Sequence, residues 1–335
     1  MNLKKLSKKT PVTILRFLIA TVPLVWICYS VNWSRLPQTL HSIAWWALPL
    51  LFFINFIGIL LQGLRWWMLM LPFEPKLSLA KTMAAHFLGL YYSIVLPTSA
   101  AQDAVRAGIL SKHTKYSLSW ASTWVSRLLG LLTLGILSLY GLFGIKPSML
   151  PPYFMESVII TFILIVILVI FSFSKRFTSP IRKTFGRLIP VKILKTIENI
   201  REAVYQYRRK KKNLLIVFGV TMIMQIIIFA GSAIVLMGIS GKFLLSETLL
   251  YLPIIEVICM SIPFTPNGIG FRETMLALMF NQVGLTKEHL AIYIVMCYLL
   301  ISLKLIGGLP LLINAAIKLG NRNIAQSNDT LPKQY

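Results

Sequence analysis

The sequence predicts an all-α integral membrane protein, and three observations support this class. Of the 335 residues, 56% are hydrophobic and only 13% are charged, whereas roughly a quarter of the residues in soluble domains are charged. Long apolar runs, such as Trp45 to Leu61 and Leu214 to Met237, approach or reach the roughly 20 residues that a membrane-spanning helix needs. These runs do not alternate between polar and apolar residues, which excludes the short strands of a membrane β-barrel.

Six full crossings and two irregular segments account for the apolar stretches. The expected crossings lie at about 12–30, 43–63, 119–143, 156–173, 214–238 and 290–312. In each irregular segment, about 79–110 and 244–282, an apolar helix runs into prolines and then into a shorter helical stretch. We interpret these segments as re-entrant hairpins that enter from opposite faces, which suggests an inverted repeat. The alternative is eight full crossings.

Basic residues set the expected orientation. There are 34 Lys+Arg against 10 Asp+Glu, a formal charge of +24, and the cytoplasmic loops of membrane proteins are rich in such residues. We therefore expect a cytoplasmic (inner) membrane protein with both termini in the cytoplasm. A full crossing of the first irregular segment would move Lys112 and Lys115 outside, so the charge bias favours a hairpin there. Nucleic-acid binding is disfavoured because no basic folded domain stands apart from the spans.

The loop 174–213 is the most basic stretch, and we expect it to be cytoplasmic. Within it, apolar residues at helical spacing predict an amphipathic helix. These residues are Ile193, Ile197, Ile200 and Val204. Such a helix fits against the anionic head groups of the inner leaflet, but topology alone explains its charge equally well. The chain thus divides into a single membrane domain, 1–320, and a polar tail, 321–335.

No cofactor and no metal site is expected. The cysteines Cys28, Cys259 and Cys297 and the four histidines are scattered, without the spacing of metal ligands. The sequence also lacks a glycine-rich nucleotide-binding loop. Any energy for transport therefore has to come from a lipid gradient, an ion gradient or a partner.

The two irregular segments resemble each other. In each, a proline that follows an apolar helix, Pro97 or Pro263, precedes an arginine by nine positions, Arg106 or Arg272. Interrupted hydrophobic segments at matching places in two halves are the best sequence indication of a transporter's central site. A charge near mid-membrane costs roughly 2.5–3.5 kcal/mol on insertion scales, so it usually faces an interior or a cavity. The charged residues of these segments are therefore candidates for a binding site.

The leading interpretation is a phosphate held by Arg106 and Arg272 through charged, fork-shaped hydrogen bonds. Asp103 and Glu273 would orient these guanidinium groups or bind a cationic part of the ligand. The alternative is internal pairing, Asp103 with one arginine and Glu273 with the other. Arg127, about two turns into its span, either lines the same cavity or extends to the interface.

Other residues of the spans and hairpins have smaller expected roles. Arg65 and Lys304 lie near the inner ends of spans, where long side chains usually extend to the interface. Asn267 is a further polar candidate for contact with the ligand. The backbone of the hairpins is expected to turn at Pro97, Pro263, Pro266, Gly268 and Gly270.

Three stretches carry a family resemblance. They are Arg65-Trp66, Leu96-Pro97 to Asp103-Ala104-Val105-Arg106, and Pro263 to Arg272-Glu273, which meets the full pattern Pro-x-x-Pro-x-Gly-x-Gly-x-Arg-Glu. Over about residues 10–318, the chain resembles the flippase-like membrane region of lysylphosphatidylglycerol synthases and its stand-alone relatives. It departs from the family at Ala101 and Gln102, where glycines usually precede the acid, and at Ser126, where an acid often precedes the arginine.

The resemblance implies that membrane lipids are the partners, and that a phospholipid or lipid-linked anion is moved between leaflets. In the fused synthases a soluble aminoacyltransferase domain follows the membrane region. None follows in this sequence, so we expect a stand-alone, transporter-like member. Two alternatives remain. One is an intramembrane transferase acting on a lipid phosphate, with Asp103 or Glu273 as general base. The other is a non-catalytic partner protein that docks through the loop 174–213.

Overall fold

The computed structural model describes residues 29, 34, 36–95, 99–145, 152–174, 191–261 and 270–309. Within these residues the regular structure is helical, without β-strands, so the predicted all-α class is confirmed. The expected first crossing, 12–30, lies outside the described residues except for residue 29, and so does the tail, 321–335. The predicted site residues outside them are Pro97, Pro263, Pro266, Asn267 and Gly268.

Among the described residues, five helical segments are long and apolar enough to cross a membrane, and each lies over one of the expected crossings. They are α4 (Ala47–Met70), α7 (Tyr116–Phe143), α8 (Phe154–Ser172), α11 (Lys211–Ser240) and the segment Lys287–Gly308. This last span consists of α14 (Lys287–Leu299), α15 (Ile301–Leu305) and the 3₁₀ turn η5 (Ile306–Gly308). A short helix, α3 (Leu36–Ser42), precedes α4. The chain is therefore a multi-pass membrane protein.

The basic loop contains helix α10 (Val191–Gln206), followed by the 3₁₀ turn η3 (Tyr207–Arg209). The predicted amphipathic helix is thus present, but part of its apolar face packs on the protein. Val204 and Tyr207 are buried, and Ile200 contacts the same apolar cluster near the end of α4. At this point α10 packs on the end of the helical bundle.

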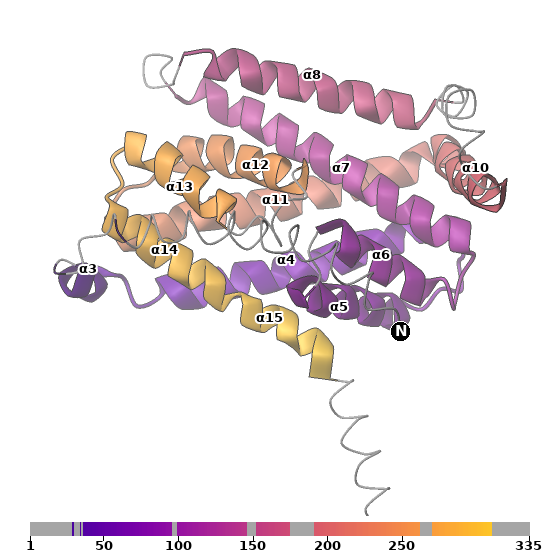
Figure 1. Ribbon diagram of the computed structural model, residues 1–335, viewed down its shortest axis with the longest axis horizontal. Helices are drawn as coiled ribbons and strands as arrows, with labels where there is room; N and C mark the ends of the chain where they lie inside the picture. Colours follow the sequence, from indigo (N-terminus) through magenta and orange to yellow (C-terminus); the bar gives the residue numbers. More distant parts are fainter. Residues whose placement is uncertain are drawn as a thin grey trace, which may run out of the picture.

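Two helical hairpins complete the bundle (Figure 1). The first consists of α5 (Leu79–Val95) and α6 (Ser99–Leu110), and the second of α12 (Leu245–Ser261) and α13 (Phe271–Gln282). The longest of these helices have 17 residues, which corresponds to about 25 Å, whereas the hydrocarbon core is about 30 Å thick. Helices of this length fit the predicted hairpins, whose depth in a membrane stays a prediction.

The hairpins enter the bundle from opposite ends. Leu77, which precedes α5, and Leu110, at the end of α6, pack in one cluster with Leu69 near the end of α4. We call this the α10 end. At the opposite end, the α3 end, Lys242 precedes α12 and donates a hydrogen bond from Nζ to the carbonyl of Gly284, which follows α13 (2.8 Å). The two breaks between paired helices are therefore approached from opposite sides of the molecule.

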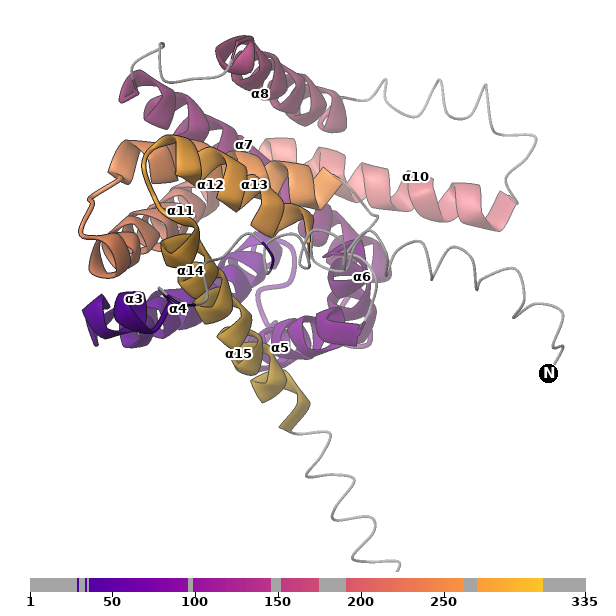
Figure 2. The same cartoon turned by 60° about the vertical axis from the view of Figure 1, so that its left-hand side comes forward.

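Glycines let the long helices approach closely. Helix α11 packs along α4, where a Cβ on Gly231 would lie 2.7 Å from Cδ1 of Ile54. Helix α12 packs along α7, where a Cβ on Gly141 would lie 2.5 Å from the backbone nitrogen of Leu250. Helix α8 packs on α7 at the edge of the bundle (Figure 1, Figure 2), and most of its apolar side chains are exposed, as on a face toward lipid.

The last span also touches the first hairpin, since α15 and η5 lie against α5 (Figure 2). A Cβ on Gly307 would collide with the backbone carbonyl of Phe87, and one on Gly308 would collide with the ring of Tyr91. No side chain larger than hydrogen fits at Gly307 unless α5 moves away from this span.

Candidate functional site

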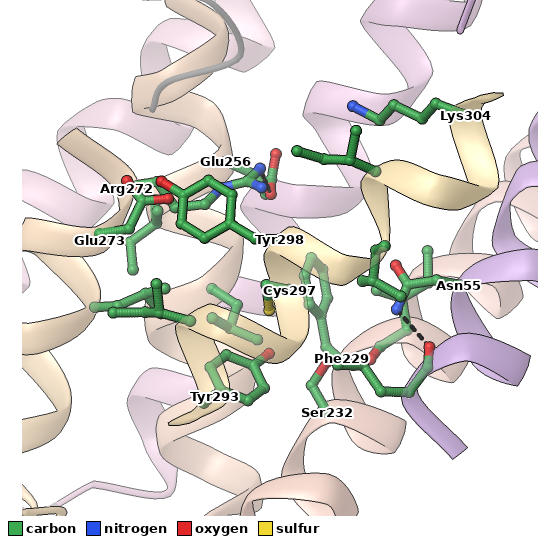
Figure 3. A pocket seen from close by; sticks show the side chains of 18 residues that line it. Asn55, Phe229, Ser232, Glu256, Arg272, Glu273, Tyr293, Cys297, Tyr298 and Lys304 are labelled. Atoms are coloured by element: carbon green, nitrogen blue, oxygen red, sulfur yellow. Dashed lines mark hydrogen bonds and ion pairs between the residues drawn. The ribbon is translucent and has the colours of Figure 1, made fainter. Parts of the chain in front are cut away.

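A cavity of about 210 Å³, lined by both apolar and polar side chains, lies inside the bundle. It is bounded by α4, α11, the second hairpin and the last span, and Figure 3 shows its lining. Asn55, one of its lining residues, is the ninth residue of α4, so the cavity lies about 12 Å from the α3 end. Its polar and charged residues are Asn55, Ser232, Glu256, Arg272, Glu273, Tyr293, Cys297, Tyr298 and Lys304.

Arg272 and Glu256 form an ion pair in this cavity. Arg272 lies in the first turn of α13 and donates a hydrogen bond from Nη2 to Oε1 of Glu256 on α12. About a third of each side chain is exposed (35% and 34%), so the pair faces the cavity while it joins the two helices of the hairpin. Because a guanidinium has five N–H donors, this single pair leaves others for a ligand.

Glu273 caps the N-terminus of α13. Its Oε2 accepts a hydrogen bond from the backbone N–H of Gly270 (2.6 Å), and the side chain is buried. Gly270 has a φ of 86°, a conformation that favours glycine, which explains this glycine of the motif. The pairing of Glu273 with an arginine is therefore not what the described structure shows: the partner of Arg272 is Glu256, because the carboxylate of Glu273 is used as a cap of its own helix.

Lys304 is a cavity residue that sequence reasoning assigned elsewhere. Instead of extending to the interface, it lines the cavity, close enough to Arg272 and Glu256 for their charges to act on it. Tyr293 and Cys297, four residues apart and on the same span, line the cavity as well. Lys304 follows Cys297 by seven residues, so the three share one helical face. Polar residues along one face of an otherwise apolar span were the feature of the sequence that could have indicated that Lys304 lines a cavity.

A second group of charges lies at the first hairpin. Asp103 on α6 pairs with Arg106 on the same helix (2.9 Å) and with Arg127 on α7 (3.2 Å). Arg106 is 5% exposed, and its guanidinium lies over the ring of Trp66 on α4, 4.8 Å from the ring centre. Trp66 donates a hydrogen bond from Nε1 to Oγ of Ser122 (3.1 Å). The structure thus brings three predicted site residues together and orients one of them through Trp66.

Arg65 belongs to the same group, and the expectation that it extends to the interface is wrong. Its Nη1 donates a hydrogen bond to Oγ1 of Thr221 on α11 (3.5 Å). A Cβ on Gly130 of α7 would lie 3.6 Å from the same nitrogen. The side chain therefore points into the bundle, where the charges of Arg106 and Asp103 act on it.

We call Arg65, Arg106 and Arg127 the arginine cluster. Neither these residues nor Asp103 are among the residues that line the cavity of Arg272. The structure therefore places Arg106 and Arg272, which the sequence predicts to share one phosphate, in two separate groups. Within the described residues, no three His, Cys, Asp or Glu side chains are placed to hold a metal ion.

The match to a family covers all of these features. The model of the family described as "Lysylphosphatidylglycerol synthase TM region" matches residues 13–306, which include both hairpins, the cavity and the arginine cluster. No curated protein and no solved structure matches the chain. Because the family match extends over most of the 335 residues, the chain belongs to the family of the lysylphosphatidylglycerol synthase TM region.

Proposed function

We propose that this chain is a lipid translocase, which moves a phospholipid or another lipid-linked anion between the two leaflets of the membrane. Its family links it with membrane lipids. One observation carries the proposal: a cavity with four charged side chains lies at the second hairpin, inside a bundle of apolar spanning helices.

Charged side chains inside a membrane usually mark the path of a substrate, because placing them there is costly. Here Glu256, Arg272, Glu273 and Lys304 surround a space of about 210 Å³, several times the roughly 30 Å³ that one water molecule occupies in the liquid. Transporters bind their substrates near the midplane, where helices are interrupted. The cavity therefore suits a polar head group, while the acyl chains remain in the bilayer.

In this proposal Arg272 binds the phosphate through N–H groups that its pairing with Glu256 leaves available, and Lys304 adds a second positive charge. Of the other ligand contacts predicted from the sequence, Glu273 lines this cavity and Asn267 lies outside the described residues. Asp103, Arg106 and Arg127 lie at the arginine cluster, outside the cavity lining. The membrane lipids are the partners, and the movement is driven by a gradient or by a further protein, since no nucleotide-binding loop is present in the sequence.

Reconstitution into liposomes tests the proposal. A tail-labelled NBD-phosphatidylglycerol in the inner leaflet reacts with added dithionite only after it moves outward. Wild-type protein should therefore cause bleaching beyond the outer-leaflet part, and Arg272→Gln and Lys304→Gln should slow this second phase. The matched controls Arg209→Gln and Lys287→Gln change exposed side chains and should behave as wild type. Bleaching no greater than in protein-free liposomes, or equal rates in Arg272→Gln and wild type, would contradict the proposal.

We also propose that the α10 end faces the cytoplasm. Exposed basic residues gather there, and cytoplasmic loops are enriched in them. They include Lys81, Lys112, Lys115 and the run Arg208 to Lys212. A cysteine introduced at Lys112 should react with a membrane-impermeant thiol reagent only in opened cells, whereas one at Lys287, at the α3 end, should react in intact cells. The opposite labelling pattern would show that the α3 end, and not the α10 end, faces the cytoplasm.

A further inference from the structure

We propose that the arginine cluster is a second binding site, for a phosphate group with net negative charge, and that it is separate from the cavity. Asp103 pairs with Arg106 from α6 and with Arg127 from α7. Arg65 from α4 points into the bundle beside them, close enough for the charges of Arg106 and Asp103 to act on it. The choice of a lipid as the natural ligand rests on the proposed function, but the existence of the site does not. Its test therefore measures binding and not lipid movement.

The first argument is the balance of charge. Asp103 is shared by Arg106 and Arg127, so it offsets one positive charge. Arg65 makes its hydrogen bond with the hydroxyl group of Thr221 and not with a carboxylate. Arg65 and Arg106 alone thus carry more charge than Asp103 neutralises. An excess charge that is buried in the protein is costly, and a bound anion removes this excess.

The second argument is unused hydrogen-bonding capacity. The Nε atoms of Arg65 and Arg106 are buried and have no hydrogen-bond partner within the part of the chain that the structure describes. Arg106 as a whole is 5% exposed. Buried polar atoms without partners are uncommon in native proteins and call for a partner. The oxygens of a phosphate accept hydrogen bonds from guanidinium groups with well-matched geometry.

The third argument is that Arg106 is held in place before any ligand binds. The ring of Trp66 lies under its guanidinium, and Ser122 fixes the indole through a hydrogen bond. At the base of the side chain, Gly89 of α5 lies so close that a Cβ there would be 3.1 Å from Cβ of Arg106. A side chain that is already ordered loses little conformational freedom when it binds, which favours affinity.

The cavity differs from the arginine cluster in its net charge. There, Glu256 and Glu273 stand against Arg272 and Lys304, so the charges balance. A balanced site does not distinguish an anionic from a zwitterionic head group by net charge, whereas the arginine cluster favours the anionic one. The ligand class is therefore a phosphate ester without a compensating ammonium group, such as the head group of phosphatidylglycerol. Free phosphate shares this chemistry.

Binding to the full-length protein in a non-ionic detergent tests the site. The Arg272→Gln variant serves as the background, because it alters the cavity and leaves the arginine cluster intact, and Lys304→Gln replaces it if folding fails. The probes are inorganic phosphate, measured by calorimetry, and phosphatidylglycerol or phosphatidylcholine, measured by native mass spectrometry. We expect phosphatidylglycerol to bind and phosphatidylcholine not to bind. Arg65→Gln should weaken the binding about tenfold.

Two further variants sharpen this test. Arg65→Lys retains the charge but not the fork-shaped donor group, so it should lose less affinity than Arg65→Gln. Arg209→Gln, at an exposed position, should have no effect. Binding of phosphatidylglycerol alone assigns the site to a lipid head group, and binding of both anions assigns it to phosphate in general.

The proposal is overturned if phosphatidylcholine binds as well as phosphatidylglycerol, or if folded Arg65→Gln binds both anions as its background does. Folding is judged from the thermal unfolding transition of each variant. Anion binding that persists in Arg272→Gln while its lipid transport equals that of wild type supports this site and contradicts the proposed function. If transport fails in Arg272→Gln and no anion binds to the cluster, the result supports the proposed function and contradicts the second site.

Discussion

Arg272 on α13 pairs with Glu256 on α12, so charge joins the two helices of the second hairpin across the break between them. Glu273, the acid next to the arginine in the sequence, is used to close the start of α13 instead. Because the pair faces the cavity, the same guanidinium both holds the hairpin and is exposed to a ligand. Changes at this pair should therefore affect stability and transport together.

Glu256→Gln should lower the stability of the protein by about 1–2 kcal/mol, because Arg272 loses its charged partner. The expected loss lies between that of an exposed and that of a fully buried pair, since about a third of each side chain is exposed. Thermal unfolding in detergent measures it. In Glu256→Gln/Arg272→Gln no unpaired charge remains, so part of the loss should be recovered. Purely additive losses in this double variant would show that the pair does not stabilise the hairpin.

Gly141→Ala should destabilise the contact between α7 and α12. The new Cβ would lie 2.5 Å from the backbone nitrogen of Leu250, and a backbone cannot move aside as a flexible side chain can. We expect a loss of about 1–3 kcal/mol, typical of overpacking, seen as a lower unfolding temperature. Gly219→Ala is the matched control, because nothing lies within 4 Å of its Cβ. Equal unfolding temperatures for the two variants would contradict this packing.

Tyr207→Phe should leave stability unchanged or raise it, although Tyr207 is fully buried. Its phenol oxygen has no hydrogen-bond partner within the described residues. Removing this oxygen therefore removes the free-energy cost of burying a hydroxyl group away from water without a partner. Tyr207→Ala, in contrast, should cost about 3–5 kcal/mol and free α10, which limited proteolysis would detect. A clear loss of stability in Tyr207→Phe would indicate a partner for the hydroxyl group.

The same tyrosine should make stability depend on alkaline pH. Burial raises the pKa of the Tyr207 phenol above its ordinary value, which is about 10. The unfolded chain therefore releases this proton at lower pH than the folded protein does. Stability from the neutral phenol is present below about pH 10 and is lost as the pH rises from there toward the folded pKa. Unfolding temperatures measured across this range should fall more steeply for wild type than for Tyr207→Phe.

Asp103→Asn should make the stability of the protein depend more strongly on phosphate. The substitution leaves Arg106 and Arg127 without their shared carboxylate, so the variant should unfold at a lower temperature than wild type in phosphate-free buffer. Added phosphate should then raise its unfolding temperature more than that of wild type, because a ligand that binds the folded state stabilises it. If phosphate raises the unfolding temperature of neither protein, this would contradict an anion site at the arginine cluster.

The spans and the interrupted segments could be predicted because they depend on local properties of the sequence. Apolar length determines where a helix crosses, and the stretches after Val95 and Ser261, where α5 and α12 end, contain the prolines that signalled the breaks. The turn at Gly270 could also be predicted, because glycine is the residue that most easily adopts a positive φ. The φ of 86° at Gly270 agrees with this prediction.

The partners of the charged residues could not be predicted in the same way. Glu256 precedes Arg272 by 16 residues, so only the folded hairpin brings them together, whereas the adjacent acid satisfies a backbone N–H. Arg65 presents a similar difficulty. A long side chain near the end of a span can reach the interface or the interior, and here Thr221, on a distant helix, gives it an interior partner.

The last span connects the two halves of the molecule mechanically. It provides Cys297, Tyr298 and Lys304 to the wall of the cavity, and near its end Gly307 lies against the backbone of Phe87 in α5 without room for a methyl group. The contact at Gly307 and the wall of the cavity thus belong to one span, with the first hairpin packed against one part of it and the cavity against another. A change in the position of the first hairpin would therefore act on the same element that closes the cavity.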